Sequence, residues 1–118
     1  MAVMNGLLNL IIEHGGVNEE YVNAHTVGFE DLKKLVAKYT PEKVQELSGV
    51  PAAKLREAGE LLSKTKTLVS TVLQEFYQSM QATAASVQIN NIHLIRGLIG
   101  RDGCGIYQMN GQPTAEHT

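Results

Sequence analysis

The sequence predicts a helix-rich α/β fold with few parallel strands. Apolar residues repeat at helical spacing through most of residues 1–64, which is typical of amphipathic helices. Residues 65–73 (TKTLVSTVL) then change to β-branched side chains, which favour a buried parallel strand. A second long helix is predicted over residues 82–99. At 118 residues the chain is long enough for one small domain with a core.

The first helices are delimited by capping residues. An apolar repeat at 3–12 ends at His14-Gly15-Gly16, because glycine tolerates the left-handed conformation of a helix C-cap. Asn18 is expected to cap a short helix that carries Tyr21 and Val22.

Further helices are expected between Phe29 and residue 64. Thr40-Pro41 supplies an N-cap and a first helical proline, Gly49 ends that helix and Pro51 opens the next. Gly59 should lower the stability of the last one. The residues expected to face inward are Phe29, Leu32, Leu35, Val36, Tyr39, Val44, Leu47, Leu55, Ala58, Leu61 and Leu62.

The second part of the chain is expected to run strand, loop, helix, loop. Residues 74–81 are predicted to be a loop after the strand. The helix at 82–99 begins with small side chains, and its apolar stripe is Ala85, Ile89, Ile92 and Ile99. Glycines punctuate residues 100–118, for which an irregular loop is predicted.

Composition excludes several classes of protein. A net charge of -2 removes the basic footprint of a nucleic-acid binder. One cysteine cannot form an internal disulfide, a structural zinc site or a cysteine-ligated cluster. The apolar stretch at 7–12 is too short to insert in a membrane, and no basic region precedes it as in a signal peptide.

Charge is concentrated in the first part of the chain. Residues 1–66 hold 17 charged side chains and residues 67–118 hold five, whereas asparagine and glutamine are frequent in the second part. Amides are buried at lower cost than ions. The second part therefore either binds a polar partner or is a core segment with a solvated loop.

Three motifs are open to a functional and a structural interpretation. Residues 42–64 resemble a helix-turn-helix, but the second helix is nearly neutral, which favours an ordinary helical hairpin. The strand–loop–helix at 66–99 has the layout of a nucleotide-binding turn without its glycines. Cys104 is interpreted as structural or incidental. The histidines lack metal-ligand spacing, and His93 is interpreted as a packed side chain.

A resemblance to a known family is carried by residues 97–115. Glycines and an arginine in the run GLIGRDGCG (97–105) are followed by MNGQPTA (109–115). This pair of motifs resembles the molybdopterin oxidoreductases, the superfamily of formate dehydrogenases and nitrate reductases. The GQPTA form is closest to the periplasmic and assimilatory nitrate reductases, and the similarity extends upstream over nearly the whole chain.

The resemblance implies that residues 1–118 are a partial domain inside a larger catalytic subunit. That domain would be Rossmann-like, of the formate dehydrogenase/DMSO reductase type, with a helical part (1–64) and a strand-loop-helix part with a cofactor-binding loop (65–118). The implied cofactor is bis-molybdopterin guanine dinucleotide with molybdenum or tungsten. The residues implied to bind it are Gln78, Gly111, Gln112, Pro113 and Thr114. The implied partner is the rest of the subunit, in the cytoplasm or the periplasm.

An alternative interpretation rests on departures from the family pattern. Gln74 and Glu75 stand where the family has a glycine, often preceded by methionine, and a carboxylate would repel a pyrophosphate. The iron–sulfur cysteine motif and an assignable metal ligand are also absent, so the chain alone is expected to be inactive. The alternative is a stand-alone helical interaction module without catalysis. Self-association through uncovered apolar faces would favour the fragment, and a monodisperse monomer the module.

Overall fold

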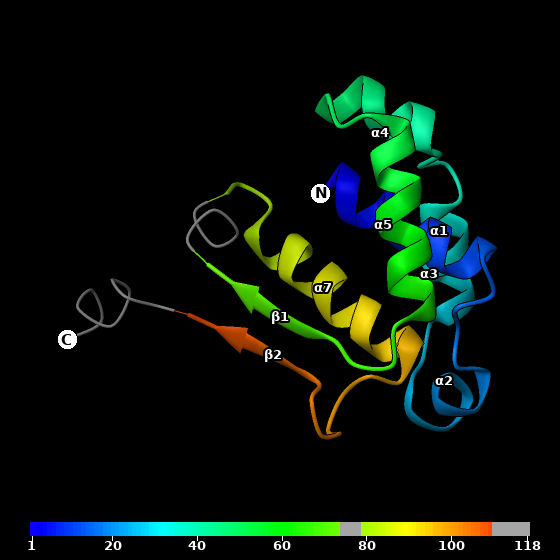
Figure 1. The fold of residues 1–118 in the computed structure, drawn as a ribbon, viewed down its shortest axis with the longest axis vertical. Coiled ribbons are helices and arrows are strands. Elements are labelled where there is room, and N and C mark those ends of the chain that lie inside the picture. The colour runs from blue at the N-terminus through cyan, green and yellow to red at the C-terminus, as the bar shows by residue number, and fades with distance from the viewer. Residues whose placement is uncertain (74–78, 110–118) are drawn as a thin grey trace.

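Six helices and a two-stranded parallel sheet make up the part of the chain that the computed structural model describes, residues 1–73 and 79–109. Figure 1 shows helices gathered on one side and the sheet, with α7 lying along it, on the other. The helices are α1 (Ala2–Glu13), α2 (Glu19–His25), α3 (Phe29–Val36), α4 (Pro41–Ser48), α5 (Ala52–Lys64) and α7 (Ala82–Arg96). The strands are β1 (Val69–Val72) and β2 (Gly105–Gln108). The helix-rich α/β class is thereby confirmed.

The predicted caps of the first helices are confirmed. The Asn18 side chain accepts a hydrogen bond from the backbone N–H of Tyr21, and the Thr40 hydroxyl accepts one from Lys43 N–H. Gly49 ends α4 with a φ of 76°, in the left-handed region. These contacts are local in sequence, which is why the sequence predicts them.

The hydrophobic core is built around α1, which contacts α3, α4, α5 and α7. Its fully buried members come from helices only, and they are Leu7, Leu8, Leu10, Ile11, Val22, Val36, Val44, Leu55, Ile92 and Ile95. Gly59 of α5 belongs to this contact, because a Cβ there would lie 2.6 Å from Cβ of Leu10. The glycine that weakens α5 locally therefore permits its close packing on α1.

Three of the leucines predicted to face inward are exposed instead: Leu35, Leu47 and Leu61. Helical spacing defines a broad stripe, and the core covers only part of its width. Val36, Val44 and Leu55 of the same helices are buried as predicted.

The predicted strand is parallel, as expected, but it is shorter than residues 65–73 and mostly not buried. β1 pairs in parallel with β2, in a register that runs from Val69 opposite Gly105 to Val72 opposite Gln108. Only Val72 of β1 is buried, and Val69 is 54% exposed. Within the described residues, β1 has one neighbouring strand and α7 on one face, so most of it is uncovered.

Two boundaries in the second part also differ from expectation. The long helix ends at Arg96 rather than residue 99, because Gly97 takes a φ of 63° and begins the turn. Residues 105–108, expected to be irregular loop, form β2. Its hydrogen bonds come from β1, far away in sequence, so local composition could not reveal them. None of the described helices has the length and apolar content needed to cross a membrane.

Candidate functional site

The carboxyl ends of β1 and β2 lie side by side and form the candidate site. Val72 pairs with Gln108, and the N–H of Met109 donates to the carbonyl oxygen of Val72 at 2.9 Å. We call this place the carboxyl edge; it comprises Val72, Leu73, Gln108 and Met109. In α/β proteins, ligands bind beyond the carboxyl ends of parallel strands.

Both segments that carry the cofactor prediction leave the sheet at the carboxyl edge. Residues 74–78 follow β1 directly and 110–118 follow β2 directly. Gln78, Gly111, Gln112, Pro113 and Thr114 themselves lie outside the described residues, as do Gln74 and Glu75. The fold thus brings together the starting points of two segments that are far apart in sequence.

The N-terminus of α7 lies at the same end of the sheet (Figure 1). Gln81 is its N-cap, and the Gln81 side chain makes no capping hydrogen bond. The first turn, beginning Ala82-Thr83-Ala84, has no acidic residue and only small side chains. The N–H of Ala82 donates to the carbonyl oxygen of Ser79 at 3.1 Å, and the helix dipole favours an anion at such a terminus.

His93 holds α7 against β1 and against the turn that follows α7. Its ring is fully buried, with Nδ1 2.8 Å from the carbonyl oxygen of Leu98 and Nε2 2.9 Å from Oγ of Ser70. A carbonyl only accepts, so Nδ1 donates to the carbonyl oxygen of Leu98, and Nε2 shares a hydrogen bond with the serine hydroxyl. The interpretation of His93 as a packed histidine is confirmed. Sequence reasoning missed Ser70, because nothing local links it to residue 93.

Buried amides attach α7 to α1. Nε2 of Gln88 donates to Oδ1 of Asn5 at 2.7 Å, and Nδ2 of Asn91 donates to Oε1 of Gln88 at 2.7 Å. Asn5 and Gln88 are both buried. Part of the amide enrichment in the second half of the chain therefore serves an internal contact.

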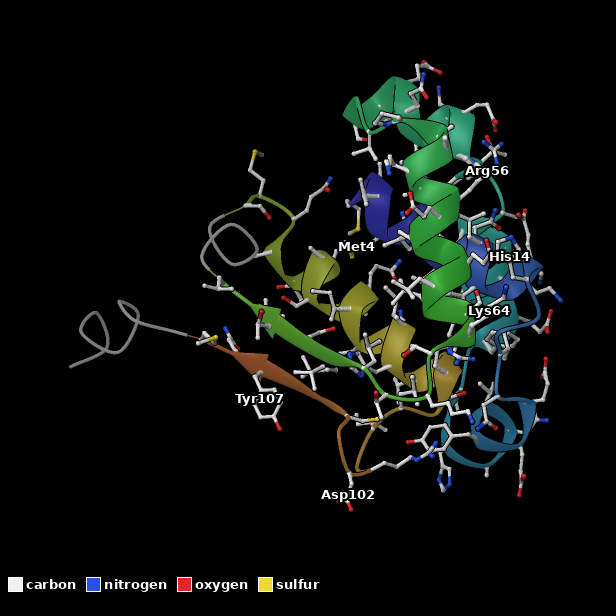
Figure 2. The ribbon with its side chains drawn as sticks, in the orientation of Figure 1. Met4, His14, Arg56, Lys64, Asp102 and Tyr107 are labelled. Carbon is white, nitrogen blue, oxygen red and sulfur yellow. The ribbon has the colours of Figure 1, made fainter. Side chains whose placement is uncertain are left out.

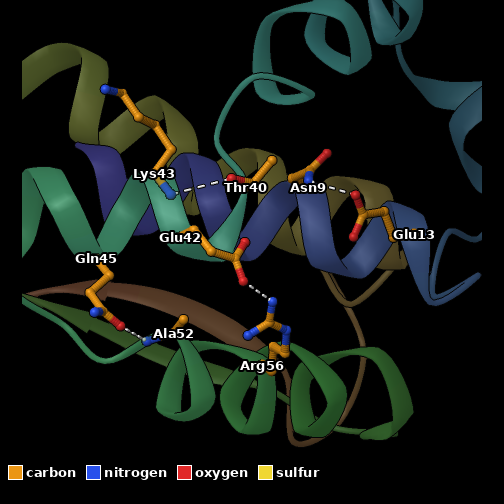
Figure 3. Close-up of polar contacts among 8 residues, drawn as sticks. All are labelled: Asn9, Glu13, Thr40, Glu42, Lys43, Gln45, Ala52 and Arg56. Carbon is orange, nitrogen blue, oxygen red and sulfur yellow. Dashed lines mark hydrogen bonds and ion pairs between the residues drawn. The ribbon is translucent and has the colours of Figure 1, made fainter.

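The helix-turn-helix-like segment forms a hairpin with its own internal polar contacts (Figure 3). Arg56 of α5 is paired with Glu42 of α4, and Oε1 of Gln45 accepts from Ala52 N–H at 2.7 Å. The hydrogen bond from Arg56 lowers the pKa of Glu42 below its usual value. Arg56 is thus engaged within the hairpin, in agreement with the structural interpretation.

The described residues contribute no candidate metal centre. No group of three or more His, Cys, Asp or Glu side chains within 1–73 and 79–109 could hold a metal ion. Cys104 is a half-buried free thiol in the turn before β2. Any metal at the carboxyl edge would depend on a cofactor or on residues outside this part of the chain.

Comparisons with known proteins agree with the resemblance. The chain is 30% identical over 115 residues to a nitrate reductase of Synechocystis, a match that covers 98% of the chain. It is 28% identical over 115 residues to formate dehydrogenase H of Escherichia coli, covering 95% of the chain. It spans only 16% of the length of either relative. No family model matches the chain. Both relatives are molybdopterin oxidoreductases, so the predicted resemblance is confirmed.

Proposed function

We propose that this chain is a segment of a molybdenum or tungsten oxidoreductase and forms part of the wall that holds one guanine dinucleotide half of its bis-molybdopterin cofactor. The observation that carries the proposal is the pairing of Val72 with Gln108. It makes the two segments predicted to bind the cofactor start from adjacent points of one sheet edge. The homology with molybdopterin oxidoreductases supplies the cofactor class.

The donor chemistry at the carboxyl edge suits a dinucleotide. The uncapped first turn of α7 offers N–H groups and no carboxylate, which suits a pyrophosphate. The amides Gln78 and Gln112, with the backbone at Gly111, can donate to and accept from a pterin or a guanine. Pro113 and Thr114 would line the same segment. The bound cofactor would supply the redox chemistry, and these residues would bind and orient it.

The face of the sheet away from α7 suits burial against the rest of a larger subunit. Side chains alternate along a strand, so Ser70 and Val72 point to α7 while the intervening residues point away. The apolar side chains on the outer face are Val69, Leu73, Tyr107 and Met109, each between 45% and 58% exposed. Exposed apolar side chains grouped on one face of a sheet are typical of an interaction surface. We propose that the partial domain is completed there, as a Rossmann-like layer, by other parts of the subunit.

The test is cofactor retention in the complete enzyme. Gln78→Ala and Gln112→Ala should each lower the molybdenum or tungsten and the guanine nucleotide recovered per protein, with the larger loss in the double variant. Asn23→Ala is the matched control, since it removes an exposed amide from α2, away from the carboxyl edge. Unchanged metal and nucleotide content in the double variant would overturn the proposal.

One observation favours the interaction module as a second candidate. The buried core cluster lies wholly in helices, α7 included, and takes no residue from either strand. The oligomeric state of the 118-residue chain, measured by sedimentation, distinguishes the cofactor-wall segment from the interaction module. A monodisperse monomer that melts cooperatively supports the module. If the chain self-associates and Val69→Lys and Tyr107→Lys abolish this, the result supports the segment proposal. The outer sheet face would then be a surface that other parts of a subunit cover.

A further inference from the structure

We propose that the chain has a separate site for a phosphate group, in a cationic pocket at the opposite end of the sheet from the carboxyl edge. The pocket has a volume of about 280 Å³. Its charged lining consists of Lys64, Lys66, Arg96 and Arg101, and we call it the basic pocket. This proposal does not depend on the proposed cofactor wall.

The fold gathers these four side chains from two stretches that lie far apart in sequence, residues 64–66 and 96–101. Lys64 ends α5 and Lys66 lies in the connection to β1. Arg96 ends α7, and Arg101 lies in the turn that leads to β2. Both connections enter the amino ends of their strands, whereas the carboxyl edge is where the strands finish. Figure 2 shows Lys64 at the foot of α5 and Asp102 on the turn before β2, at the end of the molecule away from the strand tips.

Positive charge in the basic pocket is mostly unmatched. Lys64 is paired with Glu60, at 2.5 Å between Nζ and Oε1. Within residues 1–73 and 79–109, no carboxylate lies within 4.0 Å of Lys66 or Arg101 or of the Arg96 guanidinium, and none lines the pocket. Asp102 follows Arg101 but makes no ion pair with it. In a chain of net charge -2, this is a local excess of positive charge.

Helix ends account for only half of this cluster. Lys64 and Arg96 occupy the last turns of α5 and α7, where a cation stabilises the helix dipole. Lys66 and Arg101 lie outside any helix, so that role does not explain them. Like Arg96, they make no ion pair with a carboxylate in the described part of the chain.

Arg96 provides a second, independent observation. Its Nη1 donates to the carbonyl oxygen of Gly16, and its Nη2 donates to that of Thr65 at 2.6 Å. These two bonds hold the guanidinium in place. Its Nε is buried and has no hydrogen-bond partner among the described residues. A buried donor without an acceptor is costly, and an anion in the pocket would stabilise the charge of this guanidinium without touching Nε.

The donors in the pocket suit a tetrahedral oxyanion. Arginine and lysine are the side chains that bind phosphate in proteins, through forked hydrogen bonds and point charge respectively. Asn18 also lines the pocket. Its Oδ1 is used by Tyr21 N–H, while its Nδ2 makes no hydrogen bond in the described part of the chain. Phosphate would thus meet neutral and charged donors together.

The experiment titrates the 118-residue chain with inorganic phosphate by calorimetry and by amide NMR, with chloride adjusted to keep ionic strength constant. We expect saturable binding with shifts confined to residues around Thr65, Arg96 and Arg101. Lys66→Gln/Arg101→Gln should weaken binding about tenfold or more, because two charge-assisted contacts are lost. A parallel titration uses ribose 5-phosphate, a phosphate ester. The tighter binder of the two shows whether the pocket prefers free phosphate or a phosphate ester.

The matched control is Lys33→Gln/Lys38→Gln, which removes the same charge from residues that do not line the basic pocket. It should bind phosphate as the parent chain does. Equal loss in both double variants would overturn the proposal, since the attraction would then be general. Non-saturable binding to the parent chain would also overturn it. Lys66 and Arg101 are exposed, so their substitution leaves the fold intact, which circular dichroism checks.

Discussion

His93 of α7 contacts Ser70 of β1, with Nε2 of the histidine 2.9 Å from Oγ of the serine. The other ring nitrogen, Nδ1, lies 2.8 Å from the carbonyl oxygen of Leu98. One buried ring thus joins α7 to β1 and to the turn that leads to β2. This contact holds α7 against β1, and the ladder between β1 and β2 places their carboxyl ends side by side.

Replacing His93 should destabilise the fold more than replacing an exposed histidine. His93→Ala leaves a cavity and removes the partner of Ser70 and of the Leu98 carbonyl, which should cost about 3 kcal/mol in the free energy of unfolding. Urea denaturation measures it, with His14→Ala on the surface as control. Equal midpoints for the two variants would contradict the prediction.

Ser70→Ala tests the same contact from the other side. Alone it should cost about 1 kcal/mol, the contribution of one hydrogen bond. Combined with His93→Ala it should add little further loss, because the contact is already gone. A double-mutant cycle on urea midpoints checks this, and strict additivity would show that the two side chains do not interact.

Removing one member of the buried amide pair Asn5–Gln88 should lower the free energy of unfolding more than removing both. Asn5→Leu leaves Nε2 of Gln88 buried without its acceptor, at a cost of about 2 kcal/mol. Asn5→Leu/Gln88→Leu should recover much of that loss, since two apolar side chains replace the pair. The free energies of unfolding are compared by thermal denaturation. A double variant no more stable than Asn5→Leu would argue against the pair being isolated from water.

Gly59→Ala should destabilise the chain although alanine is the better helix former. The added Cβ would lie 2.6 Å from Cβ and 2.8 Å from Cδ1 of Leu10, which separates α5 from α1. Overpacking of this kind costs about 1–3 kcal/mol, more than the gain of about 1 kcal/mol in helix propensity.

Gly49→Ala is the control for this substitution. No atom lies within 4 Å of the Cβ it would add, so its cost is only that of the left-handed φ of 76°. Leu10→Ala/Gly59→Ala should be less than additive because the smaller side chain relieves the clash. A melting temperature raised by Gly59→Ala would refute the close packing of α5 on α1.

Acid should weaken the α4–α5 hairpin through Glu42. Arg56 lowers the pKa of this carboxyl in the folded chain, so the folded state binds its proton less readily than the unfolded state. The stabilisation is therefore complete above the unfolded pKa of about 4.5 and is lost as the pH falls through the lower folded value. The difference in melting temperature between the parent chain and Glu42→Gln should shrink from pH 6 toward pH 3. Glu30→Gln, at an exposed carboxyl without an ion pair in the described residues, is the matched control.

Local features account for what the sequence predicts well. Asn18, Thr40 and Gly49 act on neighbours within a few residues, so their caps are visible in the sequence alone. The order strand, helix and glycine-rich segment was also correct. The proposed cofactor residues, from Gln78 to Thr114, rest on the resemblance and stay predictions.

The amino-acid sequence alone predicts the caps at Asn18, Thr40 and Gly49, the change to an α/β unit and the likeness to molybdopterin oxidoreductases. Three other features become visible only in the folded chain: residues 105–108 pair with β1, His93 reaches Ser70, and Arg96 and Arg101 share a pocket with Lys64 and Lys66. The difference lies in the sequence separation over which each kind of interaction acts. Caps and periodicity act over one or two helical turns, whereas these contacts form only when the folded core brings distant segments together.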